Sequence, residues 1–116
     1  VLDGAYHGNL TSLIEISPYK FDGPGGKGAP PFVHKLDTPD PYRGQYRGRT
    51  EATGLKYVAD ARQVIEDLNA AGKKLVGLIA EPMMGCAGQV IPPPRYLKHL
   101  FEYYPIAKKL DLVFLD

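Results

Sequence analysis

The chain of 116 residues is 44% hydrophobic and 23% charged, a composition that fits one globular domain or part of a larger one and excludes a disordered polymer. Its 14 basic and 13 acidic side chains leave a net charge of +1, which gives no electrostatic reason to expect nucleic acid or an acidic membrane as a partner. No apolar run approaches the roughly 20 residues that span a bilayer, and the single cysteine suits a reducing, cytoplasmic compartment.

The first half of the chain predicts short elements between loops. Residues 1–3 resemble the end of a strand, and residues 9–16 predict a short helix with Asn9 or Thr11 as its N-cap. The density of Gly and Pro predicts a loop over residues 17–31, because these residues interrupt regular structure. A short strand is expected at residues 32–36, followed by turns at residues 37–42.

The second half predicts regular structure. Apolar side chains recur every three or four positions over residues 51–71, which indicates an amphipathic helix, and Gly72 is expected to end it. The run 75–80 predicts a strand buried on both faces, and residues 81–94 predict a loop. Residues 95–109 predict a second helix that Pro105 ends or kinks near Tyr104, and residues 111–116 predict a second buried strand. The side chains expected to face inward are Leu55, Val58, Ala59, Arg62, Ile65 and Leu68 on the first helix, and Leu97, Leu100, Phe101 and Tyr104 on the second.

The alternation of helices and strands predicts an α/β fold, with a partial, open, mostly parallel sheet and crossover helices. Ligands of such sheets bind beyond the carboxyl ends of the strands. The sequence therefore directs attention to the residues after Asp3, to those after Ala80, and to Asp116. Since the chain begins without Met and closes on a strand-like run, we expect it to be part of a longer protein.

Several patterns are better explained without a ligand. Residues 23–28 match G-x-G-x-x-G, but no strand precedes them and Ala-Pro-Pro follows, so they predict a surface loop. Residues 42–49 interleave arginine and aromatic side chains, and packing together with pairing of Arg43 to phosphate or carboxylate is favoured over nucleic-acid binding. The three histidines are too scattered to predict a metal site, and Cys86 is interpreted as a small buried apolar residue.

Two features point to chemistry. Tyr6, His7 and Gly8 come directly after a strand end, where an aromatic ring, an imidazole and a glycine suit a planar ligand. Glu81 follows a strand of apolar residues, and packing alone explains a carboxylate there poorly. Turn chemistry and solvated strand ends stay open as alternatives at both places.

Five segments match one family pattern in order: AYHG at residues 5–8, PDPYRG at 39–44, LIAEPMMGCAG at 78–88, PPPRYL at 92–97 and LVFLD at 112–116. Together they resemble the class-III aminotransferases, which are fold-type-I enzymes that use pyridoxal 5′-phosphate (PLP). The resemblance implies that residues 1–116 are a central fragment of the PLP-binding large domain. The phosphate-binding loop would lie upstream and the Schiff-base lysine downstream, so no catalytic residue is expected within the chain.

The resemblance also implies roles for single residues. Tyr6 would stack on the cofactor ring, with His7 beside it, and Asp116 would face the pyridinium nitrogen and keep it protonated. Glu81 would lie near the cofactor and substrate end of the site. The intact protein would be a homodimer that transfers the amino group of a small amino substrate.

The reaction branch has alternatives. Many relatives that alternate between two amino substrates carry a glutamate where this chain has Cys86, so a dual-specificity switch is not expected. Residues 12–21, with Gly85 and Cys86, are similar to the phospho-lyases that eliminate phosphate from phosphorylated amino alcohols. An alternative of another class is a non-catalytic, small α/β binding module.

Overall fold

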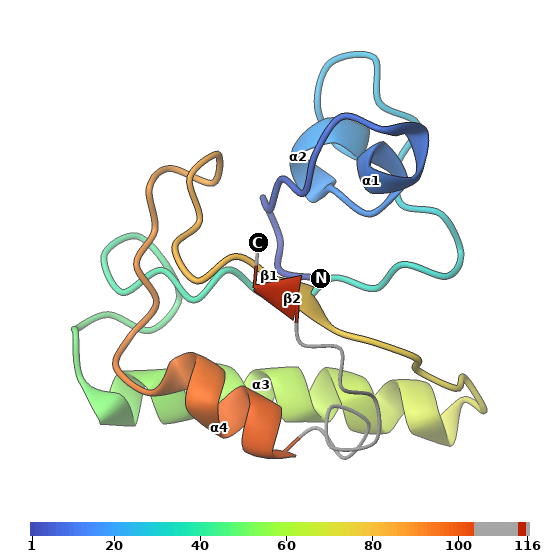
Figure 1. The fold of residues 1–116 in the computed structure, drawn as a ribbon. Coiled ribbons are helices and arrows are strands. Elements are labelled where there is room, and N and C mark those ends of the chain that lie inside the picture. The colour runs from blue at the N-terminus through green and yellow to red at the C-terminus, as the bar shows by residue number, and fades with distance from the viewer. Residues whose placement is uncertain (104–113, 116) are drawn as a thin grey trace.

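The computed structural model describes residues 1–103 and 114–115, which form four helices and one pair of strands. β1 and β2 pair in parallel, with Ile79 opposite Phe114 and Ala80 opposite Leu115. Figure 1 shows α3 and α4 side by side below the strands and the short helices α1 and α2 above them. In chain order the elements are α1 (Thr11–Glu15), α2 (Pro18–Phe21), α3 (Glu51–Ala70), β1 (Ile79–Ala80), α4 (Tyr96–Tyr103) and β2 (Phe114–Leu115). Within the described residues, no helix has both the length and the apolar character to cross a membrane.

Helix α3 confirms the helix predicted over residues 51–71 and its expected end at Gly72, and the structure adds an N-cap that was not predicted. The Thr50 side chain accepts a hydrogen bond from the Thr53 backbone N–H at 3.2 Å, which is an N-cap. At the other end Gly72 has φ +76°, and its N–H donates to the Asn69 carbonyl while the Lys73 N–H donates to the Leu68 carbonyl. This two-bond ending needs a left-handed residue, which glycine adopts without strain.

The buried face of α3 differs from the predicted one. Val58 and Ile65 are buried as expected, but Leu55, Ala59 and Arg62 are exposed. Small residues such as Gly54 lie on the buried face of α3 instead. A Cβ built on Gly54 would lie 3.0 Å from the Pro94 carbonyl oxygen, so a larger side chain has little room there. The spacing of large apolar side chains did not predict this face, because the close approach of a neighbouring backbone to α3 determines which residues are buried. The buried residues of α3 are Thr53, Gly54, Tyr57, Val58, Ala61 and Ile65.

Helix α4 lies within the predicted second helix, residues 95–109, and it packs on α3. Leu100 is fully buried and Tyr96 is 1% exposed, while Leu97 packs partly buried against the same core. Burial raises the pKa of the Tyr96 phenol well above its usual range, so this hydroxyl stays protonated. Tyr104 and Pro105 lie outside the described residues.

The strand prediction for residues 75–80 is right only at its end. β1 contains Ile79 and Ala80, and Val76 is 74% exposed although burial on both faces was expected. Pairing with β2 covers only the last two residues of the run, and the rest borders an open apolar groove of about 500 Å³. Other walls of this groove come from residues 32–36 and from the Ile65 and Leu68 side chains of α3.

The first half holds less strand and more helix than predicted. Residues 32–36 form no strand, and a parallel bridge between Leu2 and Leu36 joins them to the chain start. Within the predicted loop 17–31, α2 forms one helical turn, because Pro18 occupies the first helical position, where its missing N–H costs nothing. The N-cap of α1 is Leu10, not Asn9 or Thr11, and its side chain makes no cap hydrogen bond.

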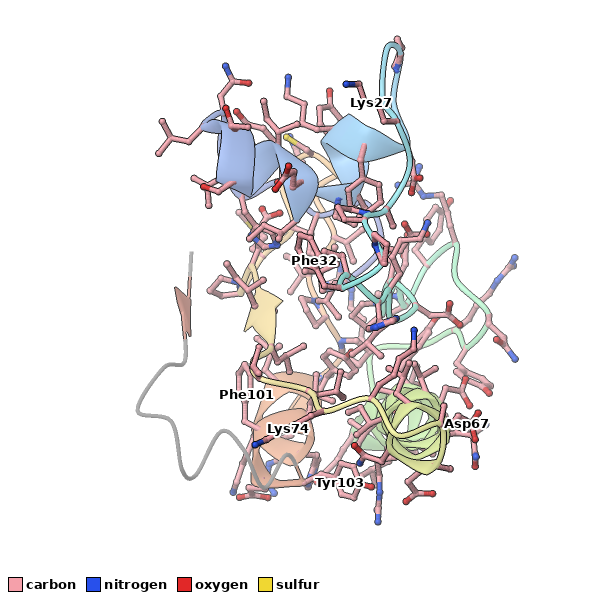
Figure 2. All side chains as sticks on the ribbon, turned by 90° about the vertical axis from the view of Figure 1, so that its right-hand side faces the viewer. Lys27, Phe32, Asp67, Lys74, Phe101 and Tyr103 are labelled. Atoms are coloured by element: carbon pink, nitrogen blue, oxygen red, sulfur yellow. The ribbon has the colours of Figure 1, made fainter. Side chains whose placement is uncertain are left out.

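The glycine-rich segment 23–28 is a surface loop, as predicted. Gly25, Gly26, Lys27 and Gly28 are exposed, and Figure 2 shows Lys27 at the tip of a loop that stands away from α3 and α4. No described helix begins directly after this loop, so it offers no helix N-terminus to a phosphate.

Candidate functional site

Glu81 joins two of the predicted site segments. It follows Ala80, the last residue of β1, and its Oε1 accepts a hydrogen bond from the Tyr6 backbone N–H at 2.8 Å. Its Oε2 accepts from the Gly85 backbone N–H at 3.1 Å. The carboxylate is therefore not a solvated strand end, because it ties the segment around Tyr6 to the loop after β1.

The backbone on both sides of Tyr6 is held by α1 and α2. The Ala5 carbonyl accepts from the Tyr19 N–H at 3.1 Å, and the His7 N–H donates to the Ser17 Oγ at 2.9 Å. The Ser17 hydroxyl in turn donates to the Leu13 carbonyl at 2.6 Å. Three consecutive residues, 5–7, are thus held by hydrogen bonds to residues at least ten positions away in the sequence.

The Tyr6 ring also has defined neighbours. Its edge-to-face partner is Tyr19, with ring centroids 5.9 Å apart and an interplanar angle of 74°. The Lys20 Nζ lies 5.8 Å from the centroid of the same ring, within the range of a cation–π interaction. Tyr6 is partly exposed, whereas the neighbouring His7 is 5% exposed.

The 81–90 loop returns on itself beside these residues. Met84 and Val90 form an antiparallel bridge, with each N–H donating to the other carbonyl at 2.9 Å. Gly4, at φ +73°, approaches this loop so closely that a Cβ built on it would lie 3.0 Å from the Ala87 Cβ. A guanidinium nitrogen of Arg43 occupies the space that a side chain at Gly88 would need. Segments around residues 4, 43 and 88 therefore meet at the carboxyl end of β1.

Asp40 orders the turn that carries Arg43. Its carboxylate accepts hydrogen bonds from the backbone N–H groups of Tyr42 at 2.8 Å and of Arg43 at 3.0 Å, and the Arg43 Nε lies 3.5 Å from its second oxygen. Burial acts to raise the pKa of Asp40, but these hydrogen bonds outweigh it and hold the pKa below its usual value. The predicted pairing of Arg43 with a carboxylate is confirmed.

Tyr57 of α3 supports the same turn from below. Its hydroxyl accepts from the Tyr46 N–H at 3.1 Å and donates to the Asp40 carbonyl at 3.0 Å. Gly44 lies against that hydroxyl, with no room for a Cβ. The Tyr57 side chain therefore connects the core of the molecule to the turn at residues 39–46.

The hydrogen bond from the Tyr6 N–H to Glu81 brings two of the predicted site residues together, and His7 follows Tyr6 in the chain. Asp116 lies outside the described residues. The interpretation of Cys86 as buried is wrong, because it lies exposed in the 81–90 loop, whose buried side chains are Met84 and Val90. Within the described residues, no three His, Cys, Asp or Glu side chains cluster so as to hold a metal ion.

Sequence reasoning missed Gly4 and Ser17. A glycine directly after a strand is a signal for close approach of another backbone, and Gly4 could have been found in this way. Nothing in the sequence around Ser17 indicates that its hydroxyl receives the His7 N–H.

No protein-family model matches the chain. The chain is 36% identical over 104 residues to an alanine–glyoxylate aminotransferase 2-like protein of Drosophila melanogaster, with 87% of this chain and 21% of that protein covered. It is 35% identical over 107 residues to ethanolamine-phosphate phospho-lyase homolog 1 of Caenorhabditis elegans, with 84% and 23% covered. The chain belongs to the class-III aminotransferase family. It spans about a fifth of the length of these curated relatives.

Solved structures show the same α/β transaminase fold. A PLP-bound amine transaminase from an uncultivated Pseudomonas species superposes with a TM-score of 0.69 and 28% identity, over 87% of this class-III chain and 22% of that chain. An omega transaminase of Pseudomonas jessenii in complex with PMP gives a TM-score of 0.72 over 96% of this chain and 24% of that chain. At 21% identity, the second match speaks for the fold alone. The order helix, strand, helix, strand with a parallel pair is confirmed, and the wider open sheet stays a prediction.

Proposed function

We propose that residues 1–116 are a central part of the PLP-binding large domain of a class-III enzyme that transfers the amino group of a small amino substrate. The observation that carries the proposal is the hydrogen bond between Glu81 and the Tyr6 backbone, which joins the two segments singled out from the sequence. Homology to aminotransferases along almost all of the chain supports it.

The residues present fit a flat aromatic cofactor. Tyr6 offers a partly exposed ring whose backbone and edge are both held, and the glycine at position 4 lets the 81–90 loop approach it. PLP, when bound, supplies an electron sink for negative charge at the α-carbon of the substrate. Tyr6 would stack on its ring, and His7, fixed through Ser17, would keep the neighbouring backbone in place.

We assign to Asp116 the role of holding a proton on the pyridinium nitrogen, because a carboxylate facing this nitrogen stabilises its protonated form. β1 and β2 end at the same edge of the sheet, with Ala80 opposite Leu115. In the complete protein, Asp116→Ala should sharply lower kcat, and Tyr6→Ala should weaken retention of PLP. Tyr42→Ala, at an exposed side chain, is the control. Wild-type rates in the Asp116→Ala protein would refute the role given to it.

The lysine that would hold the cofactor is proposed to lie outside this chain. A test is to treat the 116-residue chain and the complete protein with PLP and borohydride, and to map the modified lysine by mass spectrometry. A stable adduct is expected only in the complete protein, on a lysine outside these residues. A specific adduct on one lysine of the 116-residue chain would overturn the proposal.

Phospho-lyase activity is the second candidate, and two observations favour it. The chain is 35% identical to a protein named as an ethanolamine-phosphate phospho-lyase homolog, and Cys86 is exposed where amino-exchanging relatives are expected to carry a glutamate. Incubation with a phosphorylated amino alcohol distinguishes the branches. Release of inorganic phosphate indicates elimination, whereas amino-group transfer to a keto acid without phosphate release indicates transamination.

We also infer that the complete protein is a homodimer that works in the cytoplasm. The support is family membership for the first and the single cysteine for the second. Sedimentation equilibrium tests the first inference, and a monomer at micromolar concentration would refute it. Cell fractionation tests the second, and recovery in an organelle would refute that.

A further inference from the structure

We propose that Glu81 is a positioning residue that fixes the Tyr6 peptide, and through it the orientation of the Tyr6 ring toward the cofactor, and that it does not bind the amino substrate. This inference rests on the proposed function and assigns one residue a definite task within it.

Both carboxylate oxygens of Glu81 are used by the backbone. Oε1 accepts from the Tyr6 N–H at 2.8 Å and Oε2 accepts from the Gly85 N–H at 3.1 Å. Hydrogen bonds from N–H groups to an ionised carboxylate are shorter and stronger than those between neutral groups. Only a carboxylate offers two acceptor oxygens at this size, because a glutamine amide would turn an N–H group toward one of the two N–H donors.

The position of Glu81 explains why the bond matters for the ring. Glu81 directly follows β1, so its backbone is anchored in the sheet, whereas Tyr6 lies in a segment without regular structure. The neighbours Ala5 and His7 are tied to Tyr19 and Ser17, which belong to the α1–α2 side of the molecule. The Glu81 carboxylate therefore fixes the position of Tyr6 relative to the sheet, while Tyr19 and Ser17 hold the residues on either side of it to the α1–α2 side of the molecule.

A second contact joins the same two segments. Gly4 lies two residues before Tyr6, and Ala87 lies six residues after Glu81. The two are in contact, with no room between them for a side chain at position 4. The two segments thus touch at one point through packing and at another through the carboxylate. Rotation of the Tyr6 peptide would break its hydrogen bond to the Glu81 carboxylate and turn the ring.

The test uses the complete protein with Glu81→Gln, Tyr6→Ala, the double variant, and Glu15→Gln as a control at an exposed carboxylate of α1. The dissociation constant of PLP, hydrogen exchange at the Tyr6 amide, and KM for the amino substrate at saturating PLP are measured. Loss of a charge-assisted hydrogen bond should weaken PLP binding roughly tenfold in Glu81→Gln and speed exchange at Tyr6, with KM and the control unchanged. The double variant should bind PLP no more weakly than Tyr6→Ala alone, because the ring that Glu81 positions is already absent.

A raised KM in Glu81→Gln, with PLP affinity and Tyr6 exchange as in the unchanged protein, would show that Glu81 contacts the substrate and would overturn the inference. If Glu81→Gln does not fold, the unchanged protein decides, because exchange at the Tyr6 amide as fast as at an open amide would also overturn it. Failure of the unchanged protein to bind PLP would instead refute the proposed function.

Discussion

Removal of one hydroxyl group from α3 is expected to loosen the turn at residues 39–46. Tyr57 is 2% exposed, and its hydroxyl bonds the Tyr46 N–H at 3.1 Å and the Asp40 carbonyl at 3.0 Å. Tyr57→Phe keeps the ring and its edge contact with the Tyr46 ring, at 5.0 Å between centroids, so the change isolates the hydroxyl. Leaving partly buried groups without partners costs about 1–3 kcal/mol, and we expect a loss of about 2 kcal/mol in local stability.

Hydrogen exchange at the Tyr46 amide measures this loss directly. A change of about 2 kcal/mol corresponds to exchange roughly 30-fold faster in Tyr57→Phe. The matched control is Tyr42→Phe, which removes a hydroxyl from a residue that is 79% exposed and should leave the rate unchanged. Equal exchange rates at Tyr46 in the two variants would refute the reasoning.

The other predictions concern a tight glycine and a carboxylate beside a histidine. Gly44→Ala should lower the midpoint of thermal unfolding, because its methyl group would collide with the Tyr57 hydroxyl. The control is Gly77→Ala, whose methyl group meets nothing within 4 Å and should leave the midpoint unchanged. Equal midpoints in the two variants would contradict the close contact between Gly44 and Tyr57. The hydrogen bond from His99 at 2.9 Å holds the pKa of Glu51 below its usual value, so Glu51 stabilises the fold above its unfolded pKa, and this contribution is lost as pH falls through the folded pKa. The stability difference between the wild type and Glu51→Gln should therefore shrink as the pH falls below 4.5, the ordinary pKa of a glutamate, in denaturation experiments, and a difference that stays constant there would speak against this ion pair.

Local signals predicted the parts of the fold that local interactions determine. The length of α3 was predicted from its periodicity and from Gly72, which acts on the nearest backbone groups at its end. Its buried face could not be predicted in the same way. Gly54 and Thr53 are buried because a neighbouring backbone lies close to them, and the pattern of hydrophobic residues does not indicate such an approach.

The candidate site shows the same division. Tyr6 was predicted because an aromatic ring after an expected strand suits a planar ligand, and Glu81 because packing explains a carboxylate at a strand end poorly. Their hydrogen bond joins residues 75 positions apart, and no sequence pattern specifies which donor a carboxylate will meet at that separation. Cys86 was misjudged because cysteine is usually buried, whereas here Met84 and Val90 fill the interior of the loop.

The contact between Gly4 and Ala87 limits how this protein can be redesigned. Position 4 requires glycine for two independent reasons, its left-handed backbone and the missing space beside Ala87. Any redesign of this region should therefore leave Gly4 untouched. Met83, by contrast, is 57% exposed on the same loop, so a change of side-chain size there is expected to disturb the fold less.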